Sequence, residues 1–430
     1  MMNNFYQRIK EGLLKLSLLT WVLVGFFVTF LLFFIQPVFF DPSHNMQFNQ
    51  YIPVLSPIGH DFRGIVLLSS TWLHTRTFPL VIYPPFTLVF FAPFTLLNYG
   101  AGYKILTCII LICYILTTLI LPFWMSAQKS ISALAMLVFV TGMVSYGLQF
   151  EIERGQWNLI AFTFCLIAIY IFHHYPRRRW LAYLFFTISV QLKLFPAIFV
   201  FALIEDWSDW KDNLKRFVGL GIFNIATFFI FGLDPVRQTI GYYINLHGLI
   251  FGPPNNISIS SFAALFLSSG LLPQQGFFLW LEANDGVFQF LLFAFFVLCF
   301  VIILGRAYKG NGSGFDPFVF MACVVGALII PSISFDYKLS ILPASVALSI
   351  PAILERQGGR NRSLVSLLVF VLFMVFSSTL YSYRVKPEII RNDLPALLVI
   401  LAIYTILSFV KSDGMAEPLS DANEIISDDQ

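Results

Sequence analysis

The chain has 430 residues, of which 58% are hydrophobic and only 11% are charged, and its mean hydropathy is +0.80. A soluble domain carries roughly a quarter charged residues, so this composition excludes a water-soluble globular protein. The formal net charge is only +3. The basic residues stand in short clusters between apolar runs, which excludes the basic surface of a nucleic-acid-binding protein.

Apolar segments of membrane-spanning length recur from one end of the sequence to the other. One helical crossing of the hydrocarbon core needs about 20 apolar residues. Runs such as Leu364–Leu380 are apolar on every side and do not alternate, which favours helices over strands. The sequence therefore predicts an all-α polytopic membrane protein. Its thirteen apolar segments lie near residues 16–40, 79–97, 103–123, 131–149, 157–173, 180–204, 216–232, 257–272, 287–305, 317–333, 338–353, 364–380 and 394–411.

These segments form one predicted membrane domain, residues 1–411, with no soluble domain between them. The largest hydrophilic insertions are 41–78 and 233–256, and the acidic tail 412–430 is predicted to be disordered. All five cysteines lie inside apolar runs and lack metal-ligand spacing. We therefore predict neither a disulfide framework nor a metal site built on these cysteines.

Clusters of lysine and arginine predict the orientation, because short loops rich in these residues favour the cytoplasm. The basic amino terminus and the clusters Arg306–Lys309, Glu355–Arg362 and Lys411 are predicted to lie inside, which puts the loop 41–78 outside. Two cytoplasmic ends require an even number of crossings. We therefore expect about 12 transmembrane helices plus re-entrant or interfacial segments.

The cluster His173–Arg179 leaves two interpretations of the odd segment open. If the cluster is cytoplasmic, the non-crossing segment precedes Gln156. If it is external, the short segment 257–272 does not cross. Charge alone favours the first interpretation, whereas the second keeps the amino-terminal hairpins regular, and we prefer the second for that reason.

The first outer loop holds Asp61 together with the basic residues His60, Arg63 and Arg76. A carboxylate at a membrane face can accept a proton from an attacking hydroxyl. Guanidinium groups offer paired donors to phosphate oxygens. An ordinary solvated loop explains the same residues, so both interpretations stay open. Tyr83 precedes two prolines, which are expected to fix how the next helix starts.

Three polar residues stand at the head of an apolar run or inside one. Gln156 and Asn158 begin a run, where amides can bind ligand hydroxyls or cap the helix. Lys193 lies within the segment 180–204. A lysine inside a membrane helix costs roughly 2.5 to 3.5 kcal/mol, so we expect it to face a cavity, a partner or an anionic ligand such as a phosphate. Snorkelling is the alternative, which its distance from both segment ends disfavours.

Two later outer loops carry further polar residues. Asp336 and Lys338 stand between two apolar runs, where they could pair with each other or meet substrate beside Asp61. His247 and Asn255 belong to a loop whose aromatic and amide content suits either sugar contacts or a turn.

Five short motifs follow one another along most of the chain. They are Asp61-Phe62, Tyr83-Pro84-Pro85 with Pro93, Gly155-Gln156-Trp157-Asn158, Lys193-Leu194-Phe195-Pro196 and Pro331-Ser332-Ile333-Ser334-Phe335. In content and order they resemble the polyprenyl-phosphate-dependent mannosyltransferases of glycosyltransferase family 87. This family belongs to the GT-C superfamily, so the resemblance implies a GT-C glycosyltransferase fold.

The resemblance also implies an inverting transfer of a mannose-like hexose from a polyprenyl-phosphate sugar to a lipid or glycan acceptor. Asp61 matches the family's catalytic aspartate and would be the general base. The leaving group is already a phosphate, so a cation such as Lys193 can stabilise the developing charge. The substrate-binding candidates are His60, Arg63, Arg76, Tyr83, Gln156, Asn158, Lys193, His247, Asn255, Asp336 and Lys338.

By the same resemblance the protein is expected in the bacterial plasma (inner) membrane, among membrane lipids, with its active site on the extracytoplasmic face. No cofactor is expected beyond the lipid-phosphate donor, and a divalent metal is not excluded. Some relatives carry a histidine after a Pro-x-Ser-Trp stretch, where this chain has Asp336-Tyr337-Lys338. Help from a histidine is therefore not expected there, and donor and acceptor can differ from those of the relatives.

Other classes of protein remain as alternatives. A lipid-linked glycan flippase or transporter would also carry charge inside the membrane, and inverted repeats would support it, but the two halves of the chain show no clear correspondence. A glycan polymerase or ligase would carry essential arginines in a large late outer loop. A purely structural membrane subunit would tolerate substitution of Asp61.

Overall fold

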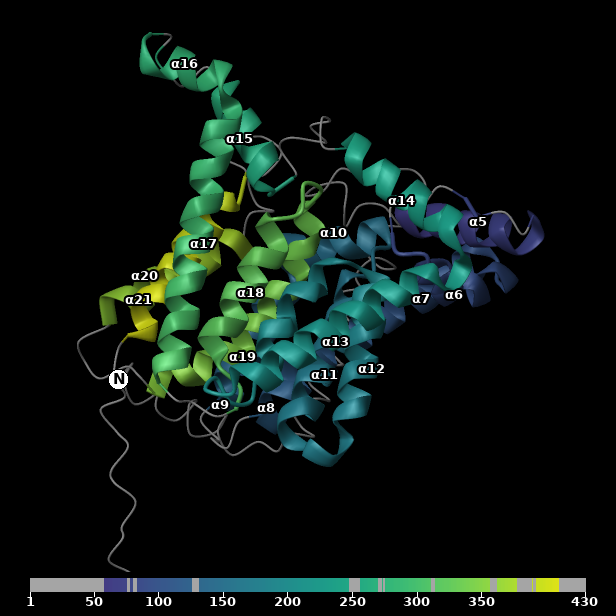
Figure 1. Ribbon diagram of the computed structural model, residues 1–430, viewed down its shortest axis with the longest axis horizontal. Coiled ribbons are helices and arrows are strands. Elements are labelled where there is room, and N and C mark those ends of the chain that lie inside the picture. Colours follow the sequence, from purple (N-terminus) through teal and green to yellow (C-terminus); the bar gives the residue numbers. More distant parts are fainter. Residues whose placement is uncertain are drawn as a thin grey trace, which may run out of the picture.

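The structure is a computed structural model that describes residues 58–75, 78–79, 83–125, 131–246, 256–269, 273, 275–310, 314–355, 362–376, 389 and 392–409. The described residues are mostly helical (Figure 1). Extended pairing among them is confined to one bridge between Asn256 and Phe335. The predicted all-α architecture is confirmed. The apolar segment 16–40, residues 41–57 and 76–77 of the first outer loop and the acidic tail lie outside the described residues.

Helices account for most of the described residues between His60 and Ser408. The α-helices are α5 (His60–Thr75), α6 (Phe86–Phe91), α7 (Tyr99–Ile115), α8 (Leu121–Met125), α9 (Ile131–Met143), α10 (Tyr146–Arg154), α11 (Asn158–His174), α12 (Arg179–Leu192), α13 (Trp210–Phe228), α14 (Leu233–Leu246), α15 (Ile259–Leu267), α16 (Phe277–Ala283), α17 (Asp285–Lys309), α18 (Pro317–Ile329), α19 (Leu342–Glu355), α20 (Arg362–Phe376) and α21 (Leu394–Ser408). Tighter 3₁₀ turns form η2 (Ala92–Leu96), η4 (Pro176–Arg178), η5 (Phe195–Leu203), η6 (Phe229–Phe231) and η8 (Asp336–Ile341), and η3 (Leu116–Ile120) is a π-helical turn.

Three helical stretches within the described ranges are long and apolar enough to cross a membrane, namely Tyr99–Trp124, Trp210–Phe231 and Asp285–Lys309. α10 and α11 would together make a fourth, but their axes meet at an angle of 114°. Other apolar helices, among them α18 and α21, are shorter, with 10 to 17 residues. The membrane character is therefore supported, whereas the expected number of about 12 transmembrane helices is not confirmed.

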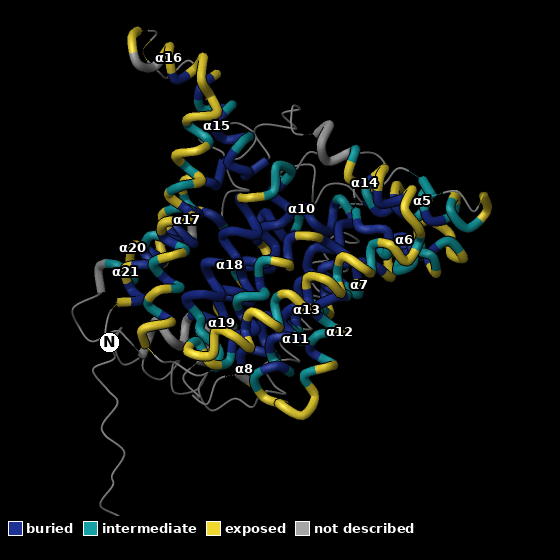
Figure 2. The backbone as a smooth tube through the Cα atoms, in the orientation of Figure 1, coloured by how far each residue is buried: buried dark blue, intermediate teal, exposed yellow. Residues whose placement is uncertain are grey.

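α18 is the central helix of the larger hydrophobic core. Every residue from Phe318 to Ile329 is buried, and the helix packs against η5, α17, α19 and α21. By contrast, α17 exposes Phe290, Leu298 and Val301. Figure 2 shows this arrangement, with exposed stretches along α13 and α17 around a buried interior. Because water would not favour such large apolar side chains, the exposed faces suit contact with lipid.

The apolar segment 180–204 folds as a hairpin, so the chain returns to the end of the bundle at which the segment begins. α12 ends at Leu192, Lys193 has an extended backbone (φ −150°, ψ 141°), and η5 then runs back. Arg179 at the start of the hairpin forms an ion pair with Glu205 just beyond its end. Both ends of the segment therefore lie at the same end of the bundle, with Lys193 at the tip. The prediction that this segment is a single membrane helix with Lys193 in its interior is wrong.

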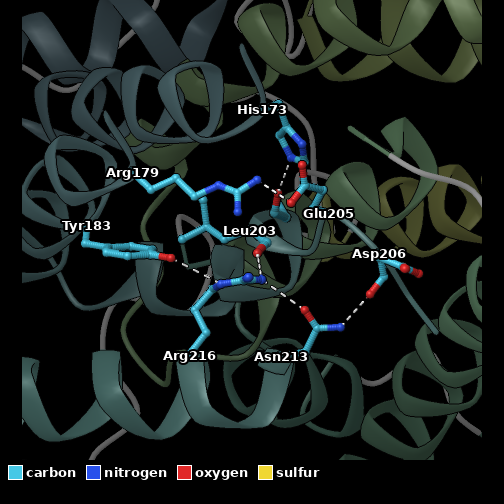
Figure 3. A network of polar contacts seen from close by, with 9 residues as sticks. His173, Arg179, Tyr183, Leu203, Glu205, Asp206, Asn213 and Arg216 are labelled. Carbon is cyan, nitrogen blue, oxygen red and sulfur yellow. Dashed lines mark hydrogen bonds and ion pairs between the residues drawn. The ribbon is translucent and has the colours of Figure 1, made fainter. Parts of the chain in front are cut away.

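Polar contacts close the base of this hairpin (Figure 3). Arg216 on α13 donates to the Leu203 carbonyl oxygen at 2.9 Å and to the Tyr183 hydroxyl at 3.2 Å. A ring nitrogen of His173 at the end of α11 lies 2.8 Å from the Ala202 carbonyl oxygen. α11, α12, η5 and α13 are thus joined at one end, and the opposite end of α11 begins at the polar site described below.

The same network relates the position of the cluster His173–Arg179 to that of the cluster Arg306–Lys309. The carbonyl oxygen of Glu205 accepts a hydrogen bond of 3.0 Å from Gly314, in the connection between α17 and α18. That connection follows directly on the cluster Arg306–Lys309, which is predicted to be cytoplasmic. Both clusters therefore lie at the same end of the bundle. The preferred interpretation put His173–Arg179 outside and Arg306–Lys309 inside, and this combination does not fit the structure, because it requires the two clusters at opposite ends.

Candidate functional site

The start of α5 is held against the end of α10 by two glycines. Gly155 has a left-handed backbone (φ +65°) that ends α10, and a Cβ atom on it would lie 2.7 Å from the Phe62 Cβ. Gly59 donates its backbone N–H to the Glu153 carbonyl oxygen at 2.6 Å. Only glycine permits this close approach without strain. The contact fixes Asp61, in the first turn of α5, beside the break between α10 and α11.

Three side chains from three separate elements form a continuous chain of hydrogen bonds. The Gln156 amide donates from Nε2 to Asp61 Oδ2 at 2.6 Å, and Gln156 Oε1 accepts from Lys193 Nζ at 2.7 Å. We call these three side chains the polar chain. Asp61 is partly buried, whereas Gln156 and Lys193 are almost fully buried. The Gln156 amide thus joins a carboxylate and an ammonium group that the sequence separates by more than a hundred residues.

Aromatic rings enclose the Lys193 ammonium group. Its Nζ lies 4.2 Å from the centre of the Tyr83 ring and 4.1 Å from that of Trp157, within the range of cation–π attraction. The Trp157 indole is itself fixed, because it donates to the Leu192 carbonyl oxygen at 3.1 Å. The Tyr83 hydroxyl lies 3.4 Å from Gln156 Nε2. These contacts replace part of the hydration that the ammonium group loses on burial.

A second buried lysine, Lys338 on η8, lies near the first. Its ammonium group donates to the Ile333 carbonyl oxygen at 2.8 Å and lies 6.0 Å from the centre of the Phe195 ring. Lys193 and Lys338 are close enough for their charges to repel, while Asp61 and Glu151 attract Lys193. Two ammonium groups close together and shielded from water favour a bound anion between them.

Asn256 hydrogen-bonds to two other loops, the one that precedes Lys338 and the one that precedes α21. Its amide donates to the Ser332 carbonyl oxygen at 3.0 Å and accepts from the Ser334 N–H at 3.0 Å. Its carbonyl oxygen accepts from the Asn392 amide at 2.9 Å. Asp393 next to it is buried, and this burial, followed by the neighbouring Asp336 carboxylate, raises the pKa of Asp393 well above its ordinary value.

The predicted site residues fall into three groups. Asp61, Tyr83, Gln156 and Lys193 meet at one centre, with Lys338 within electrostatic range. A second group lies on the same elements but outside the polar chain: His60 and Arg63 are exposed on α5, the amide atoms of Asn158 are buried without a hydrogen-bond partner among the described residues, and Asp336 acts on Asp393. The third group, which consists of Arg76, His247 and Asn255, lies outside the described residues.

Two residues of the site were not assigned a site role from the sequence. Trp157 belongs to one of the five motifs and was given no role of its own, yet it forms one wall around Lys193. Glu151 was given no role from the sequence, yet it is completely buried and bonded to two other elements. The available signal in the sequence was the pair of carboxylates Glu151 and Glu153, just before the Gly-Gln-Trp-Asn turn. Within the described ranges, no three His, Cys, Asp or Glu residues gather to hold a metal ion.

Together these elements define a polytopic membrane protein with a polar centre between its helices. The family model of glycosyltransferase family 87 matches residues 81–334, which is more than half of the chain, and the chain belongs to this family. It is therefore a membrane glycosyltransferase. The match includes Tyr83, Gln156 and Lys193, whereas Asp61 and Lys338 lie outside it. A search of the curated proteins and a search of the solved structures gave no match.

Proposed function

We propose that this glycosyltransferase moves a hexose from a polyprenyl-phosphate sugar to a hydroxyl of a lipid or glycan acceptor, on the extracytoplasmic side of the bacterial plasma membrane. The observation that supports this proposal is the polar chain. It puts a carboxylate able to accept a proton and an ammonium group able to bind a phosphate at the two ends of one glutamine side chain. A transfer from a lipid phosphate needs both groups, one on each side of the anomeric carbon.

In the proposed reaction the acceptor oxygen attacks the anomeric carbon from the side of Asp61. The bond between this carbon and the phosphate oxygen breaks, and its electron pair leaves with the lipid phosphate. The acceptor hydroxyl proton passes to the Asp61 carboxylate. Attack opposite to the leaving group inverts the anomeric configuration. Lys193, with Lys338 nearby, stabilises the phosphate before and after departure, so a general acid is not required.

Orientation supports the extracytoplasmic side. α11 runs from Asn158, two residues after Gln156 of the polar chain, to His174, next to the network that joins the basic clusters. These clusters favour the cytoplasm. The polar chain lies at the opposite end of α11, so a polyprenyl-phosphate donor would reach it from the outer leaflet, without a nucleotide-sugar domain.

Substitution of Asp61 tests the base. In proteoliposomes supplied with a polyprenyl-phosphate hexose and extracted membrane acceptors, D61N is expected to transfer sugar about 10² to 10⁴-fold more slowly, because general acid–base catalysis contributes a factor of this size. D285N is the matched control, since Asp285 is exposed on α17 and contacts Gln289. Transfer by D61N at more than a tenth of the wild-type rate would remove Asp61 from this role.

Substitution of Lys193 tests the phosphate site. K193M keeps the length and apolar stem of the side chain and removes the charge. We expect the KM for the donor to rise at least tenfold while the KM for the acceptor stays within twofold. K104M is the control, because Lys104 is exposed on α7. An unchanged donor KM in K193M would show that this ammonium group does not bind the donor.

A further inference from the structure

Glu151 connects the elements around the polar chain, although it is not part of that chain. It lies on α10 and is completely buried. Its Oε1 accepts a hydrogen bond of 2.8 Å from the Leu159 N–H in the first turn of α11, and its Oε2 accepts one from the Ser340 hydroxyl on η8. The carboxylate therefore touches three elements, α10, α11 and η8.

Glu151 also spans the break between α10 and α11. Its backbone carbonyl oxygen accepts from the Gln156 N–H at 2.9 Å, on one side of the break, and its side chain holds Leu159 on the other. The two helices meet there at 114°. A negative charge at the start of α11 is also favourable, because the helix dipole is positive at that end. Glu151 therefore determines where Gln156 stands.

Both buried lysines lie close in the structure or in the sequence to a group that Glu151 contacts. Lys193 is bonded to Gln156, and the Glu151 charge attracts its ammonium group directly. Glu151 binds Ser340 on η8, and Lys338 lies two residues before that serine. The two ammonium groups come from different parts of the sequence, and the Glu151 carboxylate hydrogen-bonds to both α11 and η8.

We propose that Glu151 is a positioning residue of the donor site, which holds Gln156 with Lys193, and η8 with Lys338, at the spacing that a phosphate group requires. This inference rests on the proposed function. Glu151 does not touch the reacting atoms. It acts through Lys193, by charge and by fixing the break, and through Lys338, by its bond to Ser340.

Two substitutions separate the charge from the geometry. E151Q keeps an oxygen that can accept from Leu159 and presents an amide to the Ser340 hydroxyl, so the shape is kept and the charge is lost. S340A keeps the charge and removes the contact to η8. The matched controls are E153Q, a buried carboxylate of α10 whose side chain pairs with Arg154, and S345A, a buried serine of α19 whose hydroxyl donates to the Ile341 carbonyl oxygen four residues earlier rather than to Glu151.

The test compares donor and acceptor kinetics in proteoliposomes, with a polyprenyl-phosphate hexose as donor. E151Q is expected to raise the donor KM at least tenfold and S340A at least threefold, while the acceptor KM stays within twofold. The double variant E151Q/K193M is expected to be no worse than K193M alone, because Glu151 acts through Lys193. A purely structural role would lower kcat together with kcat/KM for the donor and kcat/KM for the acceptor, and this result would overturn the proposal. Additive losses in the double variant would also overturn it.

The outcomes also distinguish this inference from the function on which it rests. If K193M leaves the donor KM unchanged, the proposed phosphate site fails. If K193M raises the donor KM while E151Q and S340A behave as their controls, only the positioning role fails. Thermal unfolding in detergent shows which variants fold. If E151Q does not fold, the donor KM of S340A is compared with that of S345A. An unchanged donor KM in S340A then overturns the proposal.

Discussion

Replacement of Gly155 by alanine tests the contact that positions Asp61. The left-handed backbone at φ +65° costs a residue with a Cβ about 1 to 2 kcal/mol. The new Cβ would lie 2.7 Å from the Phe62 Cβ, whereas carbon atoms pack best at about 3.5 to 4.0 Å, so the two groups must separate by about 1 Å. Phe62 cannot retreat easily, because its ring packs edge-on against Phe91 and Phe94.

The start of α5 must therefore move, and Asp61 moves with it. Overpacking adds about 1 to 3 kcal/mol, so G155A is expected to lose about 2 to 5 kcal/mol of stability. A displacement of about 1 Å at a reacting group costs about 100-fold in rate. We expect sugar transfer per folded molecule to fall by about that factor, at a nearly unchanged donor KM, because Lys193 stays in place.

The assay measures transfer in proteoliposomes, normalised to the folded fraction from thermal unfolding in detergent. G221A on α13 is the control, since a Cβ there meets nothing within 4 Å. It is expected to keep the wild-type rate and to gain about 0.5 to 1 kcal/mol, because alanine suits a helix better than glycine. A G155A variant with wild-type rate and stability would refute the assignment of the glycine contact as the support for Asp61.

Three further predictions follow from the same contacts. Q156A removes the hydrogen bond of the Lys193 ammonium group. Because a hydrogen bond to a charged group contributes about 1.5 to 3 kcal/mol, kcat/KM should fall by at least tenfold. A loss below threefold would contradict a role for the polar chain. Cysteines at Arg178 and Lys309 should react with a membrane-impermeant maleimide from the same side in sealed vesicles, and reaction from opposite sides would contradict the shared end of the bundle. The raised pKa of Asp393 means that its neutral form is favoured in the folded state, so thermal stability should fall as the pH rises through that pKa, and D393N should flatten this fall; equal pH profiles would exclude the effect.

Much of the centre could be predicted from single residues. Asp61, Gln156 and Lys193 are polar residues beside or within apolar runs, and burial of such groups is unfavourable unless they meet partners. Each was therefore a candidate, and the structure brings them together. Which of them would touch was not predictable, because the contacts join positions that lie 95 and 37 residues apart.

The hairpin at residues 179–205 shows why the path of the chain was harder to predict. Hydropathy reports how apolar a segment is, and a helix followed by a returning turn is as apolar as one continuous helix. Two local signals point to the turn, namely Lys193 in the middle of the run and Pro196 three residues later, since proline disfavours helix in the residue before it. The opposite charges of Arg179 and Glu205 at the two ends were a third signal.

The hairpin also has a consequence for how this protein assembles in the membrane. As the segment leaves the ribosome, its length and apolar content match those of an ordinary spanning helix. Non-helical backbone at such a depth is tolerated only when protein surrounds it, and here Thr87 and Trp157 supply donors to the carbonyl oxygens of the tip. The base, however, is completed by Gly314, which is synthesised more than a hundred residues after Glu205. The donor site is therefore expected to mature late, after the carboxyl-terminal helices have been made.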